Sequence, residues 1–221
     1  MHIMASALIL GLLVNGSARA EAPKKLKTIR LASPDTSKGL PLMKALKARK
    51  TTRDYSDKAV SIRQLSDLLW AANGINRKDG KRTSPAGNNR QEIDIYVVLK
   101  EGIYLWDAAR NQLNPIIEGD HRTETGQQDF VNTAPLNLVF VLNLAGKDGA
   151  KSRLSEEETR DRLGSALIAA GSQTQNVALY CASEGLGNVV RGWIDNDLLA
   201  KTMKLGSDQH ILVAQTVGYP K

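Results

Sequence analysis

The stretch that decides the fold is Leu136-Asn-Leu-Val-Phe-Val-Leu-Asn-Leu144. It is apolar almost without interruption, and its two asparagines lie near its ends. A strand with one face in water alternates apolar and polar residues, whereas a strand buried on both faces has a continuous apolar sequence. The stretch is therefore predicted to be the buried central strand of a sheet.

Further strands are expected on both sides of this stretch. Two segments before it are rich in β-branched and aromatic residues, and only Lys100-Glu101 separates them, which is typical of a hairpin. Two shorter apolar segments follow nearer the C-terminus. The residues predicted as strands are 93–99, 102–106, 189–190 and 211–217.

Helices are predicted where apolar residues recur at helical spacing after a capping signal. Ser61-Ile-Arg-Gln64 and Ser155-Glu-Glu-Glu158 are capping boxes, in which the two side chains satisfy free backbone N–H groups of the first turn. Glycines after the periodic residues mark helix ends. The predicted helices are 41–50, 61–73, 155–183 and 197–205, the last of them closed by Gly206.

The interleaving of these helices with strands and one hairpin predicts a single α+β layered domain around a mixed sheet. Between the regular elements, Asn114-Pro115 predicts a turn, and the polar segment 119–132 is expected to be partly helical. Residues 76–89 hold two glycines and Pro85 among polar residues, so they predict a loop long enough to be functional.

The composition excludes several classes of protein. With 221 residues, 42% hydrophobic and 24% charged, the chain is typical of a soluble globular protein. Its single cysteine, Cys181, cannot form an internal disulfide, and three histidines are too few to complete a Cys/His metal cage. The net charge of +7 comes from one segment, because residues 24–53 contain ten basic residues and one acidic residue.

The N-terminus resembles a targeting segment. An apolar run over residues 3–14 is followed by Ala18-Arg19-Ala20, a small-x-small cleavage pattern. We predict that residues 1–20 are a signal peptide, that residues 21–38 form an extended arm, and that the mature protein is exported, to the periplasm. The alternative is a buried N-terminal helix, since twelve apolar residues are too few to span a bilayer.

Arg49, Thr51 and Arg53 form a candidate anion site within the basic segment. On a helix Arg49 and Arg53 share a face, and on a strand all three residues do. Either geometry directs guanidinium groups and a hydroxyl at one anion, such as a phosphate. The alternative is a solvated basic face.

Other chemistries find little support in the sequence. The glycines of residues 185–192 follow a helix and precede a strand, which is the reverse of a dinucleotide-binding fingerprint. Ser84 and Ser172 lack a nucleophile motif, so hydrolysis by a catalytic triad is not expected. Nucleic-acid binding is not expected either, because Tyr55 is the lone aromatic residue near the basic segment.

Taken together, five motifs in order resemble the FMN-dependent nitroreductase family, particularly its SagB/ThcOx-like dehydrogenase branch. They begin with Arg49-Lys-Thr51-Thr-Arg53-Asp-Tyr55, similar to the family's R-x-S/T-x-R/K-x-F/Y opening. The others are Leu68-Leu-Trp-Ala-Ala-Asn-Gly-Ile-Asn-Arg77, Arg82-Thr-Ser-Pro85-Ala-Gly-Asn88-Asn89-Arg-Gln91, Ala182-Ser-Glu-Gly185-Leu-Gly187 and Val217-Gly-Tyr-Pro220.

The resemblance implies a three-layer nitroreductase-like fold over residues 39–221, with a mixed, mainly antiparallel central sheet between helices. It implies FMN as cofactor and a homodimer in which residues of the loop reach flavin bound by the partner subunit. Backbone N–H groups of Arg191 and Gly192 would face flavin N5, with Val190 against the ring. The implied FMN-binding residues are Arg49, Lys50, Thr51, Arg53, Pro85, Ala86, Gly87, Asn89, Val190, Arg191, Gly192 and Lys221.

The implied function is an oxidoreductase, linked to NAD(P)H or another electron donor, that acts on a small organic substrate such as a nitroaromatic or a quinone. The flavin would carry the chemistry, so no catalytic side chain and no metal ligand is expected. Two alternatives remain open. One is a SagB-like FMN oxidase or dehydrogenase of a peptide or metabolite, and the other is a flavin-binding module without catalysis.

Overall fold

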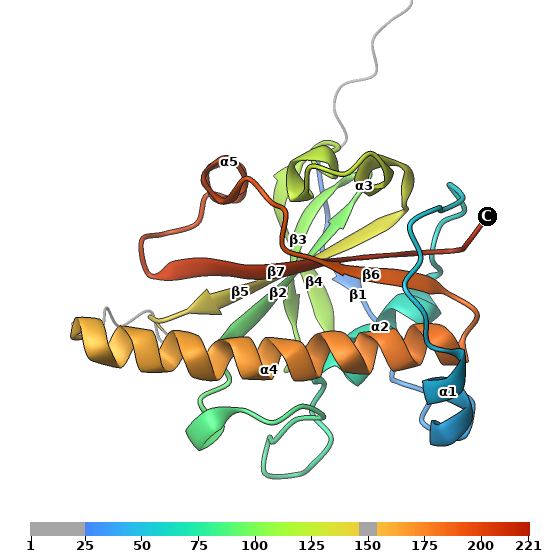
Figure 1. Ribbon diagram of the computed structural model, residues 1–221, viewed down its shortest axis with the longest axis horizontal. Coiled ribbons are helices and arrows are strands. Elements are labelled where there is room, and N and C mark those ends of the chain that lie inside the picture. Colours follow the sequence, from blue (N-terminus) through green and yellow to red (C-terminus); the bar gives the residue numbers. More distant parts are fainter. Residues whose placement is uncertain (1–24, 146–153) are drawn as a thin grey trace, which may run out of the picture.

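The computed structural model describes residues 25–145 and 154–221, which build a seven-stranded sheet with helices on both faces (Figure 1). The strand order is β1-β4-β3-β2-β5-β7-β6, and every neighbouring pair of strands is antiparallel. The strands are β1 (Ile29–Arg30), β2 (Ile93–Leu99), β3 (Gly102–Asp107), β4 (Gln112–Glu118), β5 (Leu136–Asn143), β6 (Gly187–Arg191) and β7 (Gln209–Gly218).

The apolar stretch at residues 136–144 is the central strand, as predicted. β5 lies between β2 and β7, and seven of its eight residues are buried. β2 and β3 form the predicted hairpin, with Tyr96 opposite Leu105 and Leu99 opposite Gly102. The continuous apolar sequence of β5 follows from this position, because helices cover both faces of the sheet there.

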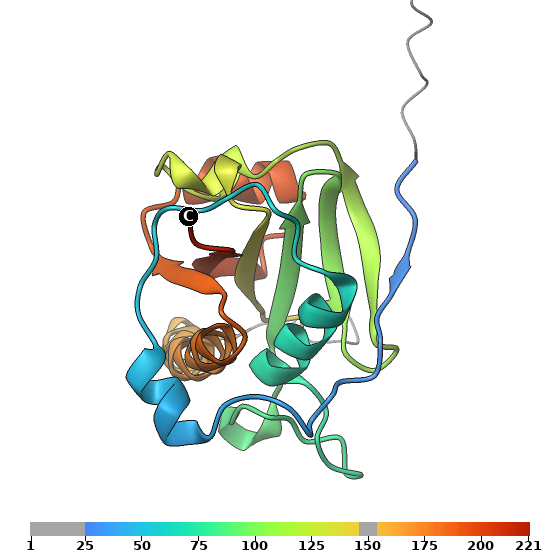
Figure 2. The same cartoon turned by 90° about the vertical axis from the view of Figure 1, so that its right-hand side faces the viewer.

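Two helical layers complete the fold (Figure 2). α2 and α4 cover one face of the sheet, α1 packs beside α4, and α3 and α5 lie over the other face. This arrangement confirms the predicted three-layer α+β fold. The helices are α1 (Leu42–Ala48), α2 (Ile62–Asn73), α3 (Phe130–Thr133), α4 (Glu156–Ser183) and α5 (Asn196–Met203), with short 3-10 turns at Gly87–Asn89 and Thr123–Thr125.

A separate hydrophobic core fills each interlayer space. Leu68, Leu69 and Val177 from the helices meet Phe140 and Leu138 of β5 on the α2 and α4 side. Side chains of α5 fill the space on the opposite side, together with residues of β2, β3, β5 and β7. In the described residues, no helix is long and apolar enough to cross a membrane.

The helix ends follow the capping signals with one exception. Gln64 N–H donates to Ser61 Oγ (3.2 Å) while Ser61 N–H donates to the Gln64 side chain, and Ser155 forms the same box with Glu158. The prediction that Gly206 closes the last helix is wrong. α5 ends at Met203, because Lys204 takes the left-handed conformation (φ 55°) and so stops the helix two residues before Gly206.

The predicted turn at Asn114-Pro115 is also wrong, because both residues lie inside β4. β1 pairs only with Gln112 and Leu113, so β4 is an edge strand from Asn114 onward. Pro115 also lies beside a register shift opposite Ile103 and Tyr104. A proline lacks a backbone N–H and is tolerated at such edges and bulges.

The predicted N-terminal arm is docked on the domain along the part that the structure describes. Residues 29–30 form β1, Ala32 N–H donates to Ser66 Oγ (3.0 Å), and Asp35 N–H donates to Asp67 Oδ1 (2.9 Å). Ser66 and Asp67 lie on α2 and are buried. The predicted signal peptide, residues 1–20, lies outside the described residues.

Candidate functional site

Residues 49–55 run along the outer edge of β6 and bring the predicted anion site to the end of the sheet. Thr51 forms a parallel bridge with Asn188, and Thr52 N–H donates to the Asn188 carbonyl (2.9 Å). Tyr55 anchors the segment, since its ring is buried and its hydroxyl donates to the Thr52 carbonyl (2.5 Å). These contacts place the basic segment beside the glycine-rich turn that precedes β6.

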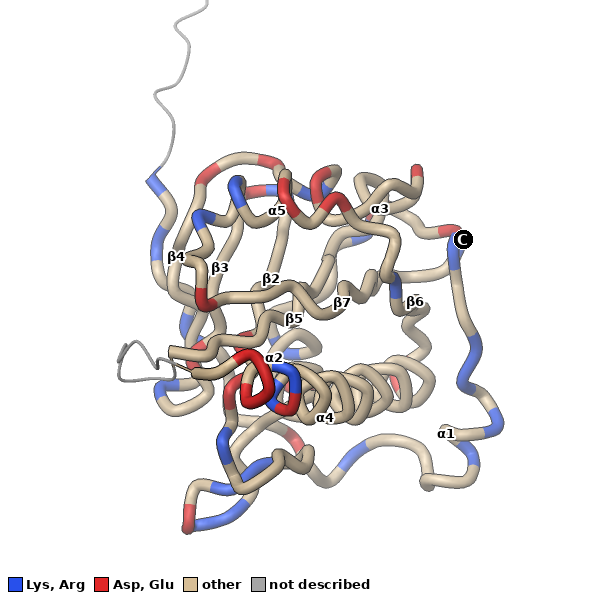
Figure 3. Tube along the Cα trace, turned by 60° about the vertical axis from the view of Figure 1, so that its left-hand side comes forward, with Lys and Arg blue, Asp and Glu red and all other residues tan. Residues whose placement is uncertain are grey.

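The cations on this segment lack carboxylate partners. Arg49 is half-buried, and Lys50 and Arg53 are exposed. Within the described residues none of the three forms an ion pair. Lys221 lies nearby, with its Nζ 3.7 Å from Asp54 Oδ1, and both side chains are exposed. Residues 49–53, which in space lie between α1 and the C-terminus, therefore carry an unbalanced positive charge (Figure 3).

Of the predicted FMN-binding residues on β6, Val190 faces solvent and Arg191 faces the interior. Side chains alternate along a strand, so Val190 is 46% exposed while Val189 and Arg191 are buried. Gly192 follows the strand and is exposed, and a Cβ there would meet no described atom within 4 Å. The chain itself thus gives no steric reason for glycine at this position, which is consistent with a ligand approaching the backbone.

The Arg191 side chain is held entirely by neutral groups. Its guanidinium donates to the Thr125 carbonyl (2.7 Å) and to side-chain oxygens of Thr125, Asn137 and Thr216. Burial lowers the pKa of this guanidinium to about 10. The sequence pointed to the backbone of Arg191, and a side chain buried this deeply was not expected.

An open cleft of about 680 Å³ adjoins Arg53, and we name it the Trp193 cleft. Trp193 is 67% exposed, and its carbonyl accepts a hydrogen bond from Gln127 N–H (3.2 Å). Neither Trp193 nor Phe130 was expected near the candidate site, although Trp193 directly follows Gly192 in the sequence. The cleft is lined by Arg53, Gln127, Gln128, Asp129, Phe130, Thr133 and Trp193.

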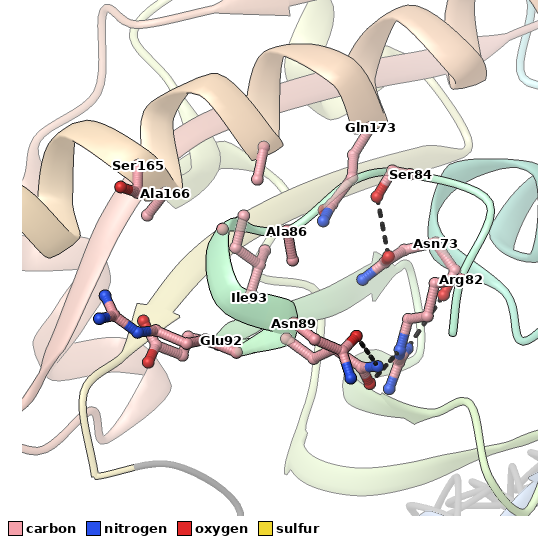
Figure 4. A pocket seen from close by; sticks show the side chains of 14 residues that line it. Asn73, Arg82, Ser84, Ala86, Asn89, Glu92, Ile93, Ser165, Ala166 and Gln173 are labelled. Atoms are coloured by element: carbon pink, nitrogen blue, oxygen red, sulfur yellow. Dashed lines mark hydrogen bonds between the residues drawn. The ribbon is translucent and has the colours of Figure 1, made fainter. Parts of the chain in front are cut away.

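The predicted loop residues lie elsewhere, under the N-terminal half of α4 (Figure 4). Ala86, Gly87 and Asn89 line a pocket against Ser165 and the neighbouring residues of α4, and Pro85 is exposed beside it. The pocket holds about 30 Å³, which is room for about one water molecule. Within one subunit it is therefore too small for a flavin.

The loop keeps an unusual backbone. Asn88, Asn89 and Gln91 all have left-handed φ values, at 53°, 55° and 48°. Non-glycine residues seldom adopt this conformation, and Asn tolerates it better than most because its short side chain can bond locally. Arg82 fixes the loop through a hydrogen bond from Nε to Gln91 Oε1 (2.8 Å). Such conformations persist where surrounding contacts enforce them and often mark functional loops.

Within one subunit, the predicted loop residues 85–89 and the cationic residues 49–53 do not lie together. Gly87 lies against Ser165 of α4, whereas Lys50 and Thr52 share a pocket with Ala182 near the end of the same helix. Seventeen helical residues separate Ser165 from Ala182, which corresponds to roughly 25 Å. The loop therefore lies against the middle of α4 and the cationic segment near its C-terminal end, and we name them the two predicted half-sites.

The comparisons with known proteins agree with this architecture. A model of the Nitroreductase family matches residues 46–219. The crystal structure of a Ralstonia eutropha protein named as a nitroreductase is 42% identical, covers 88% of this chain and 90% of its own, and superposes with a TM-score of 0.80. A Methanocaldococcus jannaschii protein of the same name is 27% identical over 186 residues, 77% of this chain and 88% of that protein.

A more distant likeness shows the fold alone. The NADPH:FMN oxidoreductase of Vibrio harveyi, in complex with NAD+, is 18% identical, covers 81% of this chain and 69% of its own, and has a TM-score of 0.60. The family match extends over most of the chain, from α1 to the end of β7. The protein therefore belongs to the nitroreductase family.

Proposed function

We propose that this protein is an FMN-dependent oxidoreductase that passes a hydride or electrons between flavin N5 and a small organic molecule. Membership of the nitroreductase family makes it an oxidoreductase. The observation that carries the proposal is the contact of residues 49–52 with the edge of β6. It puts a segment with unpaired cations against Asn188, which precedes the exposed Val190 and Gly192 by two and four residues.

The residues present fit FMN in charge and shape. A phosphate needs cations that no carboxylate neutralises, and Arg49, Lys50 and Arg53 meet that requirement in the described chain. A planar ring needs a flat, open surface, and the exposed Val190 beside a glycine provides one. Thr51 adds an exposed hydroxyl to the same segment.

We assign the phosphate and ribityl contacts to Arg49, Lys50, Thr51 and Arg53, with Lys221 as a further cation. Val190 packs against the ring. The Asn188 carbonyl points outward to Thr52, so alternation along the strand turns the backbone of Val190 outward and that of Arg191 toward β7. Val190 and Gly192 are therefore better candidates than Arg191 for a backbone N–H toward flavin N5.

When bound, FMN supplies the hydride and electron transfer. The chain's own task is to bind the phosphate, to orient the ring on β6 and to place positive charge near it. Positive charge from residues 49–53 favours the reduced cofactor, which carries negative charge near N1 and C2=O. No acid or base from the protein is required for hydride transfer itself.

We propose a homodimer, because the two half-sites cannot meet within one subunit. Two copies arranged antiparallel along α4 would bring residues 85–89 of one subunit to residues 49–53 of the other. α4 carries exposed Leu163, Leu167 and Ile168, and Ile168 is 74% exposed. Apolar side chains gathered on one helix face of a soluble protein indicate an interface.

NAD(P)H is the proposed electron donor, and a nitroaromatic or a quinone is the proposed acceptor. The Vibrio harveyi enzyme that shares the fold carries both NADPH and FMN in its name. The Trp193 cleft supports a flat acceptor, since Trp193 and Phe130 offer aromatic surface beside Arg53. No contact among the described residues favours the SagB-like or the non-catalytic alternative. The experiments below distinguish both from the proposed function.

The first experiment tests FMN binding. Protein purified with its cofactor retained, and apoprotein titrated with FMN, is expected to show a flavin spectrum and saturable binding. Arg49→Ala combined with Arg53→Ala should weaken FMN binding by about a hundredfold or more, because each of the two lost charge-assisted hydrogen bonds is worth about 1.5 kcal/mol or more. Arg30→Ala, at an exposed arginine on β1 and at the opposite edge of the sheet from β6, is the control. Unchanged binding in the double variant would remove the site assignment.

The second experiment tests the reaction. NADH or NADPH is mixed with holoprotein, and oxygen, quinones and nitroaromatics are compared as acceptors. Turnover of quinones or nitroaromatics supports the proposal. Turnover confined to oxygen, with a peptide or metabolite as donor, indicates the SagB-like oxidase, and bound FMN without any turnover indicates a binding module.

We also propose export, with residues 1–20 as a cleaved signal peptide and the periplasm as destination. The apolar run and the Ala18-Arg19-Ala20 pattern support this proposal. Cell fractionation and N-terminal sequencing of the expressed protein test it. Recovery of the uncleaved chain in the cytoplasmic fraction would contradict it.

A further inference from the structure

Arg191 is a buried cation without a partner of opposite charge. It is 3% exposed, and within the described residues no carboxylate forms an ion pair with it. The titratable group that interacts with it is Tyr55. Burial raises the pKa of the Tyr55 phenol well above its usual range, so Tyr55 is neutral at physiological pH and does not balance the charge.

A charge buried in this way is costly. Moving an ion from water into a protein interior costs several kcal/mol, and hydrogen bonds to neutral groups recover only part of this. The pKa of Arg191 stays near 10, so the guanidinium keeps its charge at neutral pH. The described chain thus retains a full positive charge in its interior with no anion to offset it.

The surroundings are shaped around the guanidinium. Thr125, Asn137 and Thr216 are each fully buried, and a side-chain oxygen of each accepts a hydrogen bond from it. At Gly126 a Cβ would lie 1.9 Å from Arg191 Nη1, so no larger residue fits there with the arginine in place. This close fit indicates that the surrounding residues are specific for a buried arginine at position 191.

The Arg191 side chain leaves β6 on the side opposite to the exposed Val190 side chain and reaches Thr216 of β7 and Asn137 of β5. Arg191 stands between Val190 and Gly192, and its guanidinium binds the Thr125 carbonyl. Two residues farther on, Gln127 N–H holds the carbonyl of Trp193, so the same segment forms a wall of the Trp193 cleft. In a dry interior, a charge acts over a longer range than in water.

We propose that Arg191 is an electrostatic partner of the reduced flavin and raises the reduction potential of the bound cofactor. Two electrons and one proton, supplied by hydride from the donor, leave the reduced ring with one negative charge. The reduced ring then gives the buried guanidinium the anion that the described residues lack. This inference rests on the proposed function, since it requires FMN on β6.

A structural role alone makes a different prediction. If Arg191 only held residues 125–127 in place, its loss would weaken oxidised and reduced FMN equally and would leave the potential unchanged. If Arg191 acts electrostatically, its loss weakens the binding of reduced FMN more than the binding of oxidised FMN. The midpoint potential therefore separates the two roles, whatever happens to activity.

Two variants remove the uncompensated charge in different ways. Arg191→Met removes the cation at similar volume. Asn137→Asp keeps the arginine and puts a carboxylate oxygen in place of the amide oxygen, Asn137 Oδ1, that accepts a hydrogen bond from Arg191 Nη2 (3.0 Å). Both variants should weaken the binding of reduced FMN, relative to that of oxidised FMN, by about tenfold. This lowers the midpoint potential by about 30 mV for a two-electron couple.

Two controls complete the test. Arg191→Lys keeps the charge and should retain most of the wild-type potential. Arg122→Met removes a nearby arginine that Asp120 already neutralises (2.7 Å), and it should leave the potential unchanged. Asn137→Asp pairs the buried charge but loses the hydrogen bond that Asn137 Nδ2 donates to the Val131 carbonyl (2.8 Å), so the folding of both variants is checked by circular dichroism. Because the two variants disturb different contacts, either one that folds carries the test.

The outcomes are distinct. A wild-type potential in Asn137→Asp and in folded Arg191→Met, with FMN bound, would overturn the inference and leave the proposed function intact. Failure of the wild-type protein to bind FMN would overturn the proposed function instead. Equal lowering of the potential by Arg122→Met would also overturn the inference, because the effect would not be specific to the uncompensated charge.

Discussion

Val190 and Arg191 are neighbours in the chain but face opposite sides of β6, and this alternation determines their roles. Val190 remains exposed for a ligand, while Arg191 enters the interior and meets Thr125, Asn137 and Thr216. The resemblance to a known family pointed to this region as a source of backbone N–H groups. The side chain of Arg191 received no role from the sequence, because its partners come from segments 25 to 66 residues away.

Gly126 offers a residue-level test of the Arg191 cradle. Gly126→Ala should lower the free energy of unfolding by about 3 kcal/mol, because the new methyl group displaces the guanidinium from its acceptors. Gly206→Ala is the control, since the nearest atom to its Cβ would be 3.8 Å away, and it should change stability by less than about 0.5 kcal/mol. Equal unfolding temperatures for the two variants would contradict this description of the cradle.

α4 is the element that separates the two half-sites, and its exposed face is the proposed dimer interface. Ile168→Glu should yield monomers in sedimentation velocity and weaken FMN binding, because a carboxylate would be buried without a partner at the interface. Ile62→Glu on α2 is the matched control, since Ile62 is also an exposed isoleucine on a helix. A dimeric Ile168→Glu protein with normal FMN affinity would rule out this face.

The N-terminal arm is also fixed to the domain by Lys38, which forms ion pairs with Asp67 and Glu184. Lys38 Nζ lies 2.8 Å from Asp67 Oδ2, and Asp67 is 3% exposed. Lys38→Met should lower the free energy of unfolding by about 1 kcal/mol, because it leaves a buried carboxylate without its cation while the partly exposed lysine limits the loss. Lys44→Met, at an exposed position on α1, should have no measurable effect in the same thermal unfolding experiment.

The molecule as a whole should be stabilised by its cofactor. If FMN binds the folded dimer and not the unfolded chain, FMN at a hundred times its Kd should add about 2.7 kcal/mol to the free energy of unfolding. The unfolding temperature should therefore rise with FMN and with protein concentration in calorimetry. Riboflavin, which lacks the phosphate, is the control and should give a smaller rise. An equal rise with both ligands would argue against the phosphate role of residues 49–53.

Much of the fold follows from local patterns in the sequence. The central strand, the β2–β3 hairpin and both capping boxes are where the sequence predicts them, because burial on two faces and N-cap chemistry leave direct marks on composition. The errors lie where tertiary contacts override local preference. Pro115 is tolerated because β1 is too short to pair with it, and the arm gains a strand because β4 offers an edge.

The sequence by itself determined the family, the layered fold and the basic segment from which the cofactor site is proposed, because motifs and periodicity are properties of neighbouring residues. Only the tertiary structure decided that the loop lies against the middle of α4 while the cations lie near its C-terminal end, and that Arg191 carries a buried charge without an anion among the described residues. Distances between segments and the pairing of buried charges depend on contacts far apart in the chain. No local pattern records them.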